Sequence, residues 1–138
     1  MTDASWIAKK LAFMETCLRE LRELGRADRL ALDVKERRFV ERTLQICISA
    51  ALDVAWHIAS DQRLGEPEAN LALFDLLVPA GWLSRETAGF LRLAAGFRKV
   101  LVRDYMAVDP QVVRTVLEQR LGDIEQFVSE IRGHLSAK

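Results

Sequence analysis

The segment AGFRKVLVRDYMAVD, residues 95–109, carries three side chains that could handle a phosphate group. Arg98 interrupts a run of small and apolar residues, and a guanidinium keeps its charge at neutral pH and needs acceptors. Arginine binds phosphate as a planar fork, so its presence in such a run points to anion recognition. Arg103 and Tyr105 follow in the same segment. Together these residues predict a phosphate-handling site.

Helix geometry limits which of these side chains can act together. At about 100° per residue, Arg98 and Tyr105 lie on one side of the expected helix, two turns apart. Arg103 lies about 140° from Arg98, so the two guanidiniums converge only if the helix unwinds or a second subunit contributes. Simpler explanations stay open. Arg98 forms a structural salt bridge or lies at a dimer interface, and Arg103 is a solvated arginine beside Asp104.

A second pair of chemically capable residues, Asp53 and His57, lies four residues apart on an earlier expected helix. Side chains at this spacing can touch, and the dipole near the C-terminal end of a helix favours a charged histidine. One interpretation is a local ion pair without a function. The other places both residues opposite the helix of Arg98, where they orient groups or carry protons.

The elements that must position these residues are all expected to be helices. Apolar residues recur at spacings of three and four, whereas no useful length alternates with period two. Ser84 and Asp109 have the side chains of helix N-caps, and Pro110 suits a first helical turn. The pattern predicts five helices, at about 5–24, 33–60, 69–78, 84–106 and from 109 onward. Long helices joined by short loops predict an antiparallel bundle.

The same periodicity predicts which faces of the helices are buried. In the fourth expected helix, Arg98 lies beside a stripe assigned to the core, namely Phe90, Ala94, Phe97 and Leu101. In the second, the core stripe is expected to be Val40, Leu44, Cys47, Ala51, Ala55 and Ile58. Cys17 and Cys47 have no metal-ligand spacing and are expected to be reduced thiols in the core.

The composition limits the classes of function. The chain has 138 residues, half of them hydrophobic, which suits a single domain over residues 1–138 with its own core. Twenty basic and twenty acidic residues give a formal net charge of zero, so no overall positive charge attracts nucleic acid or an anionic membrane. We therefore expect neither DNA nor a membrane as a partner, and a phosphate site that is local.

Targeting segments and common catalytic motifs are not recognisable in the sequence. No apolar run reaches the roughly 18 residues of a membrane span, and the first residues do not form a signal peptide, so a cytoplasmic protein is expected. HExxH, the P-loop, the Rossmann glycine pattern and Gly-x-Ser-x-Gly are missing. Two histidines argue against a dedicated zinc site, and we expect no metal and no cofactor.

Between about residues 30 and 130, four segments occur in the order ERTLQICISAALDVAWHIAS, GEP, AGWLS and AGFRKVLVRDYMAVD. In order and spacing they resemble the HepT-like proteins of the HEPN superfamily. The resemblance implies an α-helical bundle that forms a homodimer, with the active cleft at or near the dimer interface. It also implies the toxin of a toxin–antitoxin pair, which is encoded beside a small nucleotidyltransferase antitoxin, MntA.

The family's signature is an Arg, a polar residue that is commonly Asn, three further residues, a His, any residue, and a Tyr. The resemblance implies that the Arg and the His carry metal-independent RNA cleavage, and that the Tyr accepts AMP from the antitoxin, which silences the toxin. The signature Arg corresponds to Arg98 and the Tyr to Tyr105. Asp53 and His57 match acidic and His positions on the family's second helix.

Two positions depart from this signature: Lys99 replaces the usual Asn, and Arg103 replaces the His. Arginine stays protonated, so Arg103 can stabilise a charged phosphate but cannot act as a general base. Losing a proton carrier typically costs about 10²- to 10⁴-fold in rate. A ribonuclease of this kind needs a substitute carrier, for which His57 and Tyr105 are the candidates.

Three functions remain open from the sequence. The first is a HepT-like ribonuclease toxin that cleaves RNA. The second is a catalytically degenerate dimer that serves as a non-enzymatic binding partner of a nucleotidyltransferase, with Tyr105 still available for AMP. The third is a purely structural helical dimer with Arg98 and Tyr105 at its seam.

Overall fold

The computed structural model describes residues 3–67, 72–103 and 108–137. Those residues form an all-α bundle without a strand, which confirms the expected fold class. In chain order the α-helices are α1 (Ala4–Leu24), α2 (Val34–Asp61), α3 (Arg85–Arg103), α4 (Pro110–Thr115) and α5 (Leu121–Ser136). Shorter turns of helix are η1 (Ala27–Arg29), η3 (Phe74–Leu77) and η4 (Val116–Arg120).

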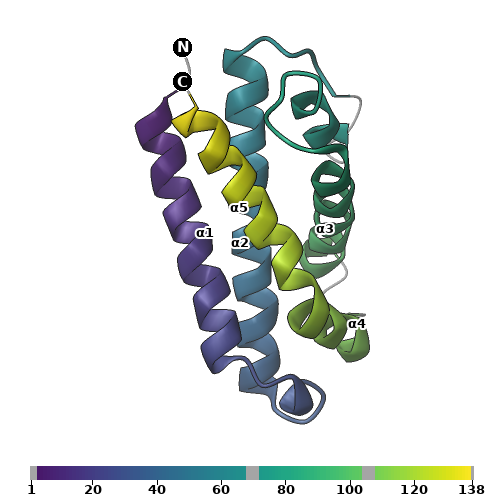
Figure 1. The fold of residues 1–138 in the computed structure, drawn as a ribbon. Helices are drawn as coiled ribbons and strands as arrows, with labels where there is room; N and C mark the ends of the chain where they lie inside the picture. The colour runs from purple at the N-terminus through teal and green to yellow at the C-terminus, as the bar shows by residue number, and fades with distance from the viewer. Residues whose placement is uncertain (1–2, 68–71, 104–107, 138) are drawn as a thin grey trace.

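The long helices run antiparallel to their neighbours, as the short loops predict. Figure 1 shows α1 descending beside α2, which ascends, and α3 descending on the other side of α2. Helix α5 crosses the bundle in front of α2 and ends near the start of α1. The pairs α1 with α2, α2 with α3, and α5 with both α1 and α3 are in direct contact. Helix α2 therefore packs between α1 and α3, and α5 packs on those two outer helices.

Polar side chains define where the helices begin. Asp33 accepts hydrogen bonds from the backbone N–H groups of the first turn of α2, and Asp109 does the same for α4. The hydroxyl of Ser84 accepts from the backbone N–H of Thr87 at 3.1 Å at the start of α3. Each bond satisfies an N–H that has no partner within the helix. The three helix starts expected from the sequence are confirmed.

The core follows the expected stripe of α2 closely. All six residues of that stripe are buried: Val40, Leu44, Cys47, Ala51, Ala55 and Ile58. Cys17 and Cys47 are both buried free thiols, as expected. Helix α2 is long and apolar enough to cross a membrane by length and composition, although no such segment was expected, and 61% of its most apolar window is buried in the bundle.

The buried face of α3 differs from the expected one. The fully buried positions of α3 are Thr87, Ala88, Leu91, Ala95 and Leu101. Of the expected stripe only Leu101 is buried, whereas Phe90, Ala94 and Phe97 are half-buried. These side chains form a second apolar face, turned toward α4, η4 and α5, where they line a hollow. Because α3 has two adjacent apolar faces, its periodicity did not identify the one that faces α2.

Two other elements also differ from expectation. The expected helix at 69–78 appears in the described residues only as the 3₁₀ turn η3, while residues 68–71 lie outside them. The expected fifth helix is a continuous helical run that contains the π turn η4 between α4 and α5. A π turn inserts an extra residue into the helical repeat. It keeps Leu117, Leu121 and Ile124 buried across the junction.

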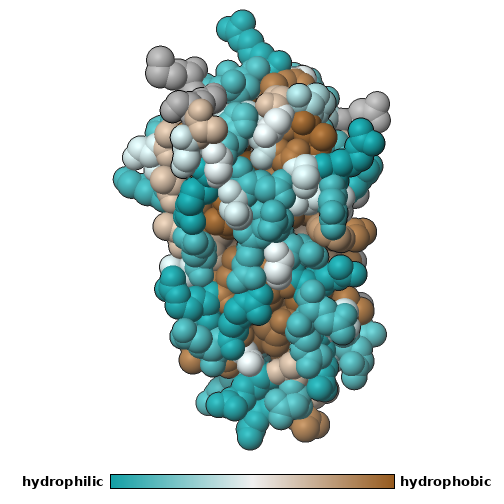
Figure 2. Space-filling model, viewed as in Figure 1, coloured by the Kyte–Doolittle hydropathy of each residue, from teal (hydrophilic) through white to brown (hydrophobic). Residues whose placement is uncertain are grey.

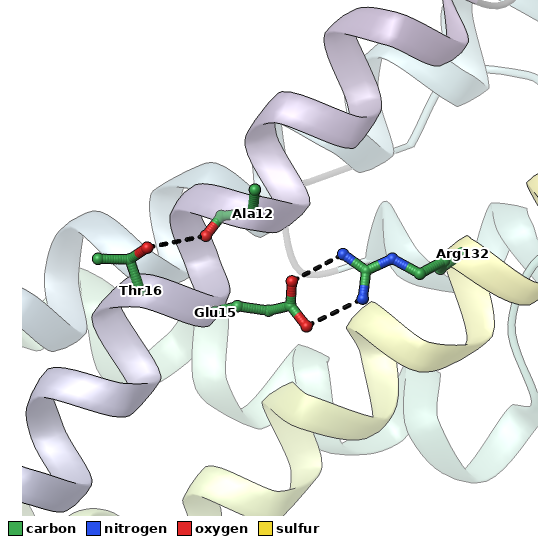
Figure 3. A network of polar contacts seen from close by, with 4 residues as sticks. All are labelled: Ala12, Glu15, Thr16 and Arg132. Atoms are coloured by element: carbon green, nitrogen blue, oxygen red, sulfur yellow. Dashed lines mark hydrogen bonds and ion pairs between the residues drawn. The ribbon is translucent and has the colours of Figure 1, made fainter.

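Charged side chains join the helices across the outside of the bundle. Figure 2 shows that the face in the view of Figure 1 is mostly hydrophilic, with apolar atoms visible between the polar side chains. On this outside, Arg132 of α5 donates two hydrogen bonds to the carboxylate of Glu15 on α1, at 2.7 and 2.9 Å (Figure 3). Arg22 of α1 pairs in the same bidentate way with Glu125 of α5. These arginines have their acceptors inside the chain.

Candidate functional site

Arg98 lies on the side of α3 that packs on α2. On an ideal helix it continues the row of Leu91 and Ala95, which are buried against α2. Its side chain is half-buried, and its Nε donates a hydrogen bond of 2.7 Å to the hydroxyl oxygen of Ser49 on α2. The hydroxyl fixes the direction of the guanidinium, because Nε is the nitrogen closest to the stem of the side chain.

The outer end of this guanidinium is free within the described part of the chain. No carboxylate there lies within ion-pair distance of Arg98, and its two terminal nitrogens form no hydrogen bond. No buried side-chain nitrogen or oxygen of the described residues lacks a partner, so these unbonded nitrogens are not fully buried. Arg98 thus keeps its charge and the two parallel N–H groups that bind a phosphate as a fork. A structural salt bridge, one of the simpler explanations, is not observed among the described residues.

Ser49 is the residue of this site that sequence reasoning missed. In the sequence it lies in the apolar run ICISA, where a serine gives no sign of a special role. In the structure its side chain is half-buried. A weak signal was present, because Ser49 lies on the side of α2 opposite the core stripe. The sequence alone could not pair it with Arg98, since 49 residues separate the two positions.

The other positions of the signature are Lys99, Arg103 and Tyr105. Arg103 is the last residue of α3, is exposed, and makes no hydrogen bond or ion pair with another described residue. Lys99, one residue after Arg98, is half-buried. Tyr105 lies outside the described residues, so its position relative to Arg98 stays a sequence-based prediction. On the described helix, Arg103 and Arg98 point in different directions, as the spacing predicted.

Asp53 and His57 are tied to α1 instead of to each other. The Nζ of Lys10 lies 3.3 Å from a carboxylate oxygen of Asp53. The backbone N–H of Asp3 donates to Nε2 of His57 at 3.2 Å, and the ring of Trp6 lies 4.8 Å from the imidazole. The expected local ion pair between Asp53 and His57 is not formed.

These contacts also define the chemistry that is left to His57. An Nε2 that accepts a hydrogen bond has its lone pair occupied, and the proton of the neutral ring then lies on Nδ1. No hydrogen bond or ion pair in the described part of the chain connects His57 or Asp53 to Arg98. The two residues lie one and two turns beyond Ser49 on α2, but their polar partners come from the start of α1.

A separate hollow of about 250 Å³ lies between α3 and the junction of α4 with α5. Its lining is largely apolar and includes Phe90 and Phe97. The cation at its edge, Arg120, lies 5.8 Å from the ring of Phe90 and pairs with Asp123 at 3.6 Å. This hollow lacks the unpaired guanidinium that marks the site at Arg98. Elsewhere among the described residues, no three His, Cys, Asp or Glu side chains are grouped as metal ligands.

Comparison with known proteins points to one family. The family described as ribonuclease HepT-like matches residues 14–131 of this chain. The chain is 28% identical over 127 residues to the mRNA nuclease HepT of Shewanella oneidensis, covering 91% of this chain and 96% of that protein. It is also 28% identical over 127 residues to the tRNA nuclease HepT of Aphanizomenon flos-aquae, covering 88% and 86% of the two chains.

Solved structures resemble the whole bundle. A toxin–antitoxin crystal structure with AMP-PNP matches with a TM-score of 0.85 at 27% identity, covering 92% of this chain and 97% of that one. A tri-AMPylated HEPN toxin of Shewanella oneidensis in complex with an MNT antitoxin matches with a TM-score of 0.84 at 28% identity, covering 92% and 96%. The cytosolic protein YutE of Bacillus subtilis matches with a TM-score of 0.88 at 20% identity, covering 99% and 92%, which shows a shared fold.

Proposed function

The chain belongs to the ribonuclease HepT-like family, and from this premise we propose that it is a HepT-type toxin, a metal-independent endoribonuclease controlled by a nucleotidyltransferase antitoxin. Two similar proteins are an mRNA nuclease and a tRNA nuclease, which supports RNA as the substrate class. Similar toxins have been solved in complex with MNT or MntA antitoxins, which supports that partner. In this proposal the protein is a homodimer, as the family resemblance implies, and it meets RNA and the antitoxin in the cytoplasm.

The observation that carries this proposal is the guanidinium of Arg98, held at Nε by Ser49 and open at its two terminal nitrogens. Such a group binds two oxygens of the phosphate at which the RNA is cut. Its orientation is fixed before the substrate arrives, so it stabilises the charge that develops on the pentacovalent phosphate without reorganising. Arg98 therefore binds and stabilises, but it moves no proton.

Proton transfer needs a different residue. Cleavage of RNA by its own 2′-hydroxyl forms a bond from O2′ to phosphorus and breaks the bond to O5′, while one proton leaves O2′ and one reaches O5′. Arg103 cannot accept the first proton, and Nε2 of His57 already accepts a hydrogen bond from the backbone N–H of Asp3. Tyr105 is the better candidate, because its phenol O–H can donate a proton to O5′ and the phenolate that results can take up the proton that O2′ releases.

Control by the antitoxin follows from the same assignment. Transfer of AMP from ATP to the hydroxyl of Tyr105 releases pyrophosphate and replaces the phenolic proton with a phosphate ester. The proton carrier is then lost, and, with Tyr105 on the same side of the helix as Arg98 as the spacing predicts, the added negative charge would occupy the guanidinium that holds an RNA phosphate. One modification would thus block both binding and proton transfer.

Incubation of the purified protein with total RNA in the presence of EDTA tests the ribonuclease function. We expect fragments that accumulate with time in EDTA, and their loss when the protein is first treated with its nucleotidyltransferase and ATP. Intact RNA at protein concentrations well above those of the substrate would contradict the proposal. The control for the second step is the same treatment with the nucleotidyltransferase but without ATP, which should leave cleavage unchanged, and a Tyr105→Phe variant that takes up no AMP verifies the modified residue.

A catalytically degenerate dimer is the second candidate, and one observation favours it. Arg103 stands where the family has its catalytic His, and the nearest alternative, His57, is engaged by α1. In that case the protein binds RNA or the nucleotidyltransferase but cuts nothing. Overproduction without the antitoxin separates the two functions: growth arrest supports the toxin, and normal growth at high protein levels supports the degenerate partner.

A further inference from the structure

The outward side of α2 forms a continuous row of residues that runs past the Arg98 site. Arg38, Arg42 and Trp56 each lie within about 20° of Ser49 around the helix axis. We call these four residues the outer ridge. The two arginines are exposed, Ser49 is half-buried, and Trp56 is 41% exposed. The buried stripe of α2 lies on the opposite side, so the ridge faces away from the core.

The N-terminal half of the ridge offers cations that the chain does not use elsewhere. Arg42 forms no ion pair or hydrogen bond with any described residue. Arg38 has one acid nearby, Glu41, which is half-buried. Burial raises the pKa of Glu41, against the lowering effect of Arg37 and Arg38. Neither Arg38 nor Arg42 forms an ion pair with a described carboxylate, so both can meet an external anion.

The C-terminal half of the ridge has a different character. Its acid, Asp53, lies beside the ridge and is paired with Lys10. Its exposed aromatic side chain, Trp56, makes no ring contact or hydrogen bond with another described residue. An exposed indole next to a phosphate site is a surface on which a nucleic-acid base can stack. Cations on one side of Arg98 and an indole on the other are the two elements of a single-strand binding groove.

We propose that the outer ridge of α2 is the track along which single-stranded RNA passes through the site. Arg38 and Arg42 bind backbone phosphates on one side of Arg98, and Trp56 stacks a base on the other. This inference rests on the proposed ribonuclease function. Arg42 and Trp56 each lie seven residues from Ser49, about 10 Å along the helix, so they would contact nucleotides that flank the bound phosphate.

RNA fits this ridge better than a protein partner does. An acidic surface on an antitoxin would pair with the arginines, but it would also need an apolar pocket in line with them to accept the indole of Trp56. Unpaired bases have a flat apolar face regardless of sequence, which matches Trp56. The overall charge of zero also means that affinity for RNA must come from local groups such as these.

Equilibrium binding of a non-cleavable RNA separates this proposal from catalysis. The probe is a fluorescein-labelled 12-nucleotide 2′-O-methyl oligouridine, whose blocked 2′-hydroxyl cannot attack the phosphate. Fluorescence anisotropy is measured at several salt concentrations for the full-length wild type, Arg38→Ala/Arg42→Ala and Trp56→Leu. The control is Lys9→Ala/Arg19→Ala, which removes the same charge from exposed positions on α1.

We expect Arg38→Ala/Arg42→Ala to bind at least tenfold more weakly, with the salt slope reduced by about 1.4, or 0.7 for each lost phosphate contact. Trp56→Leu should bind about tenfold more weakly with an unchanged slope, because stacking releases no counterions. The control should stay within about twofold of the wild type. Circular dichroism and thermal melting verify that each variant is folded.

The outcomes distinguish failure of the proposed RNA track from failure of the proposed ribonuclease function. Binding of Arg38→Ala/Arg42→Ala equal to that of the control would show that the arginines act only through overall charge. Loss of affinity for the nucleotidyltransferase with unchanged RNA binding would assign the ridge to the protein partner. If the wild type cuts RNA in EDTA while the ridge variants bind and cut normally, the ribonuclease function stands and the track alone is wrong. If the wild type binds the probe but never cuts RNA, the track stands without the nuclease.

Discussion

A single residue, Arg98, differs from the paired arginines Arg22 and Arg132 in what it contacts. Arg132 and Arg22 each donate two hydrogen bonds to a carboxylate, which leaves their charge neutralised within the chain. Arg98 donates Nε to the neutral hydroxyl of Ser49. A hydroxyl orients the guanidinium without neutralising it, so the positive charge remains available to a ligand. This contrast distinguishes a binding arginine from a structural one.

Arg103 is the residue at which a substitution should increase activity. Arg103→His restores the side chain that the family has at this position, and a histidine exchanges protons near neutral pH. We expect the rate of RNA cleavage in EDTA to rise by about 10²-fold, at the low end of what general acid–base catalysis contributes. Single-turnover cleavage of a labelled oligoribonucleotide measures the change.

The matched control for this prediction is Arg103→Lys, which keeps the charge and adds no proton carrier near neutral pH. An Arg103→His variant no faster than Arg103→Lys would show that position 103 has no access to the reacting atoms. It would then favour the degenerate partner over the toxin.

The sequence could predict part of this site but not all of it. Arg98 was identifiable because a permanent cation interrupts an apolar helix face. Its anchor, Ser49, was not, since a serine in a helix has many harmless explanations and the contact depends on how α2 and α3 pack. The contacts of Asp53 and His57 with the start of α1 were missed for the same reason: they join distant segments.

At the scale of the elements, one carboxylate of α5 fixes the start of α3. Glu130 accepts hydrogen bonds from the backbone N–H of Ser84 at 2.6 Å, from the hydroxyl of Thr87, and from the amide of Gln126 at 3.0 Å. Burial alone would raise the pKa of Glu130, but these hydrogen bonds together lower it. The negative charge also lies at the positive end of the α3 dipole. The contact sets the position of the helix that carries Arg98.

Glu130→Gln tests this cap through the pH dependence of stability. A carboxyl whose pKa is lowered by folding stabilises the protein above its ordinary value of 4.5, and this stabilisation is lost as the pH falls below that value. We expect the variant to be less stable by about 1 to 2 kcal/mol at pH 7. Urea unfolding from pH 7 to pH 3 should show the difference shrinking below about pH 4.5. A difference that is constant over this range would mean that the charge of Glu130 has no part in the cap.

The elements themselves were largely predictable, with exceptions that have physical causes. Helix α2 has one apolar face, so its periodicity identified the core directly. Helix α3 has apolar side chains on two adjacent faces, and only packing decides which one is buried against α2. The π turn η4 was not predictable, because an inserted residue leaves the local composition unchanged and is stabilised by contacts on both sides of it.

For the whole molecule, the buried core contributes far more to stability than the ion pairs outside it. Exposed pairs such as Glu15 with Arg132 are typically worth about 0 to 1 kcal/mol, because water screens both charges. Phe127 of α5 is fully buried and packs edge-to-face on Phe74 of η3, with 5.8 Å between the ring centres. Loss of such a ring removes apolar contacts and leaves a cavity.

Paired substitutions test this ranking. We expect Phe127→Ala to lower the free energy of unfolding by about 3 to 5 kcal/mol. Arg132→Ala, which removes the ion pair shown in Figure 3, should lower it by less than about 1 kcal/mol. Urea titrations at one pH measure both. Equal effects of the two substitutions would contradict the view that the core, rather than the charged surface, holds the bundle together.

A net charge of zero has a consequence for how this molecule would find RNA under the proposed function. A strongly basic protein attracts nucleic acid through its overall field, whereas this chain has twenty charges of each sign. Recognition therefore depends on the few cations that have no partner inside the chain. Among the described residues these include Arg98, Arg42 and Arg103, and the first of them is at the centre of the proposed site.

The most direct measurement is the rate of RNA cleavage in EDTA by the wild type, Arg98→Ala, Arg98→Lys and Ser49→Ala, with folding verified for each. We predict that Arg98→Ala abolishes cleavage and that Arg98→Lys is nearly as impaired, because lysine keeps the charge but lacks the fork. Ser49→Ala should retain activity reduced several-fold, since only the orientation of the guanidinium is lost. Wild-type rates of cleavage in Arg98→Ala would contradict the assignment of phosphate binding to this guanidinium.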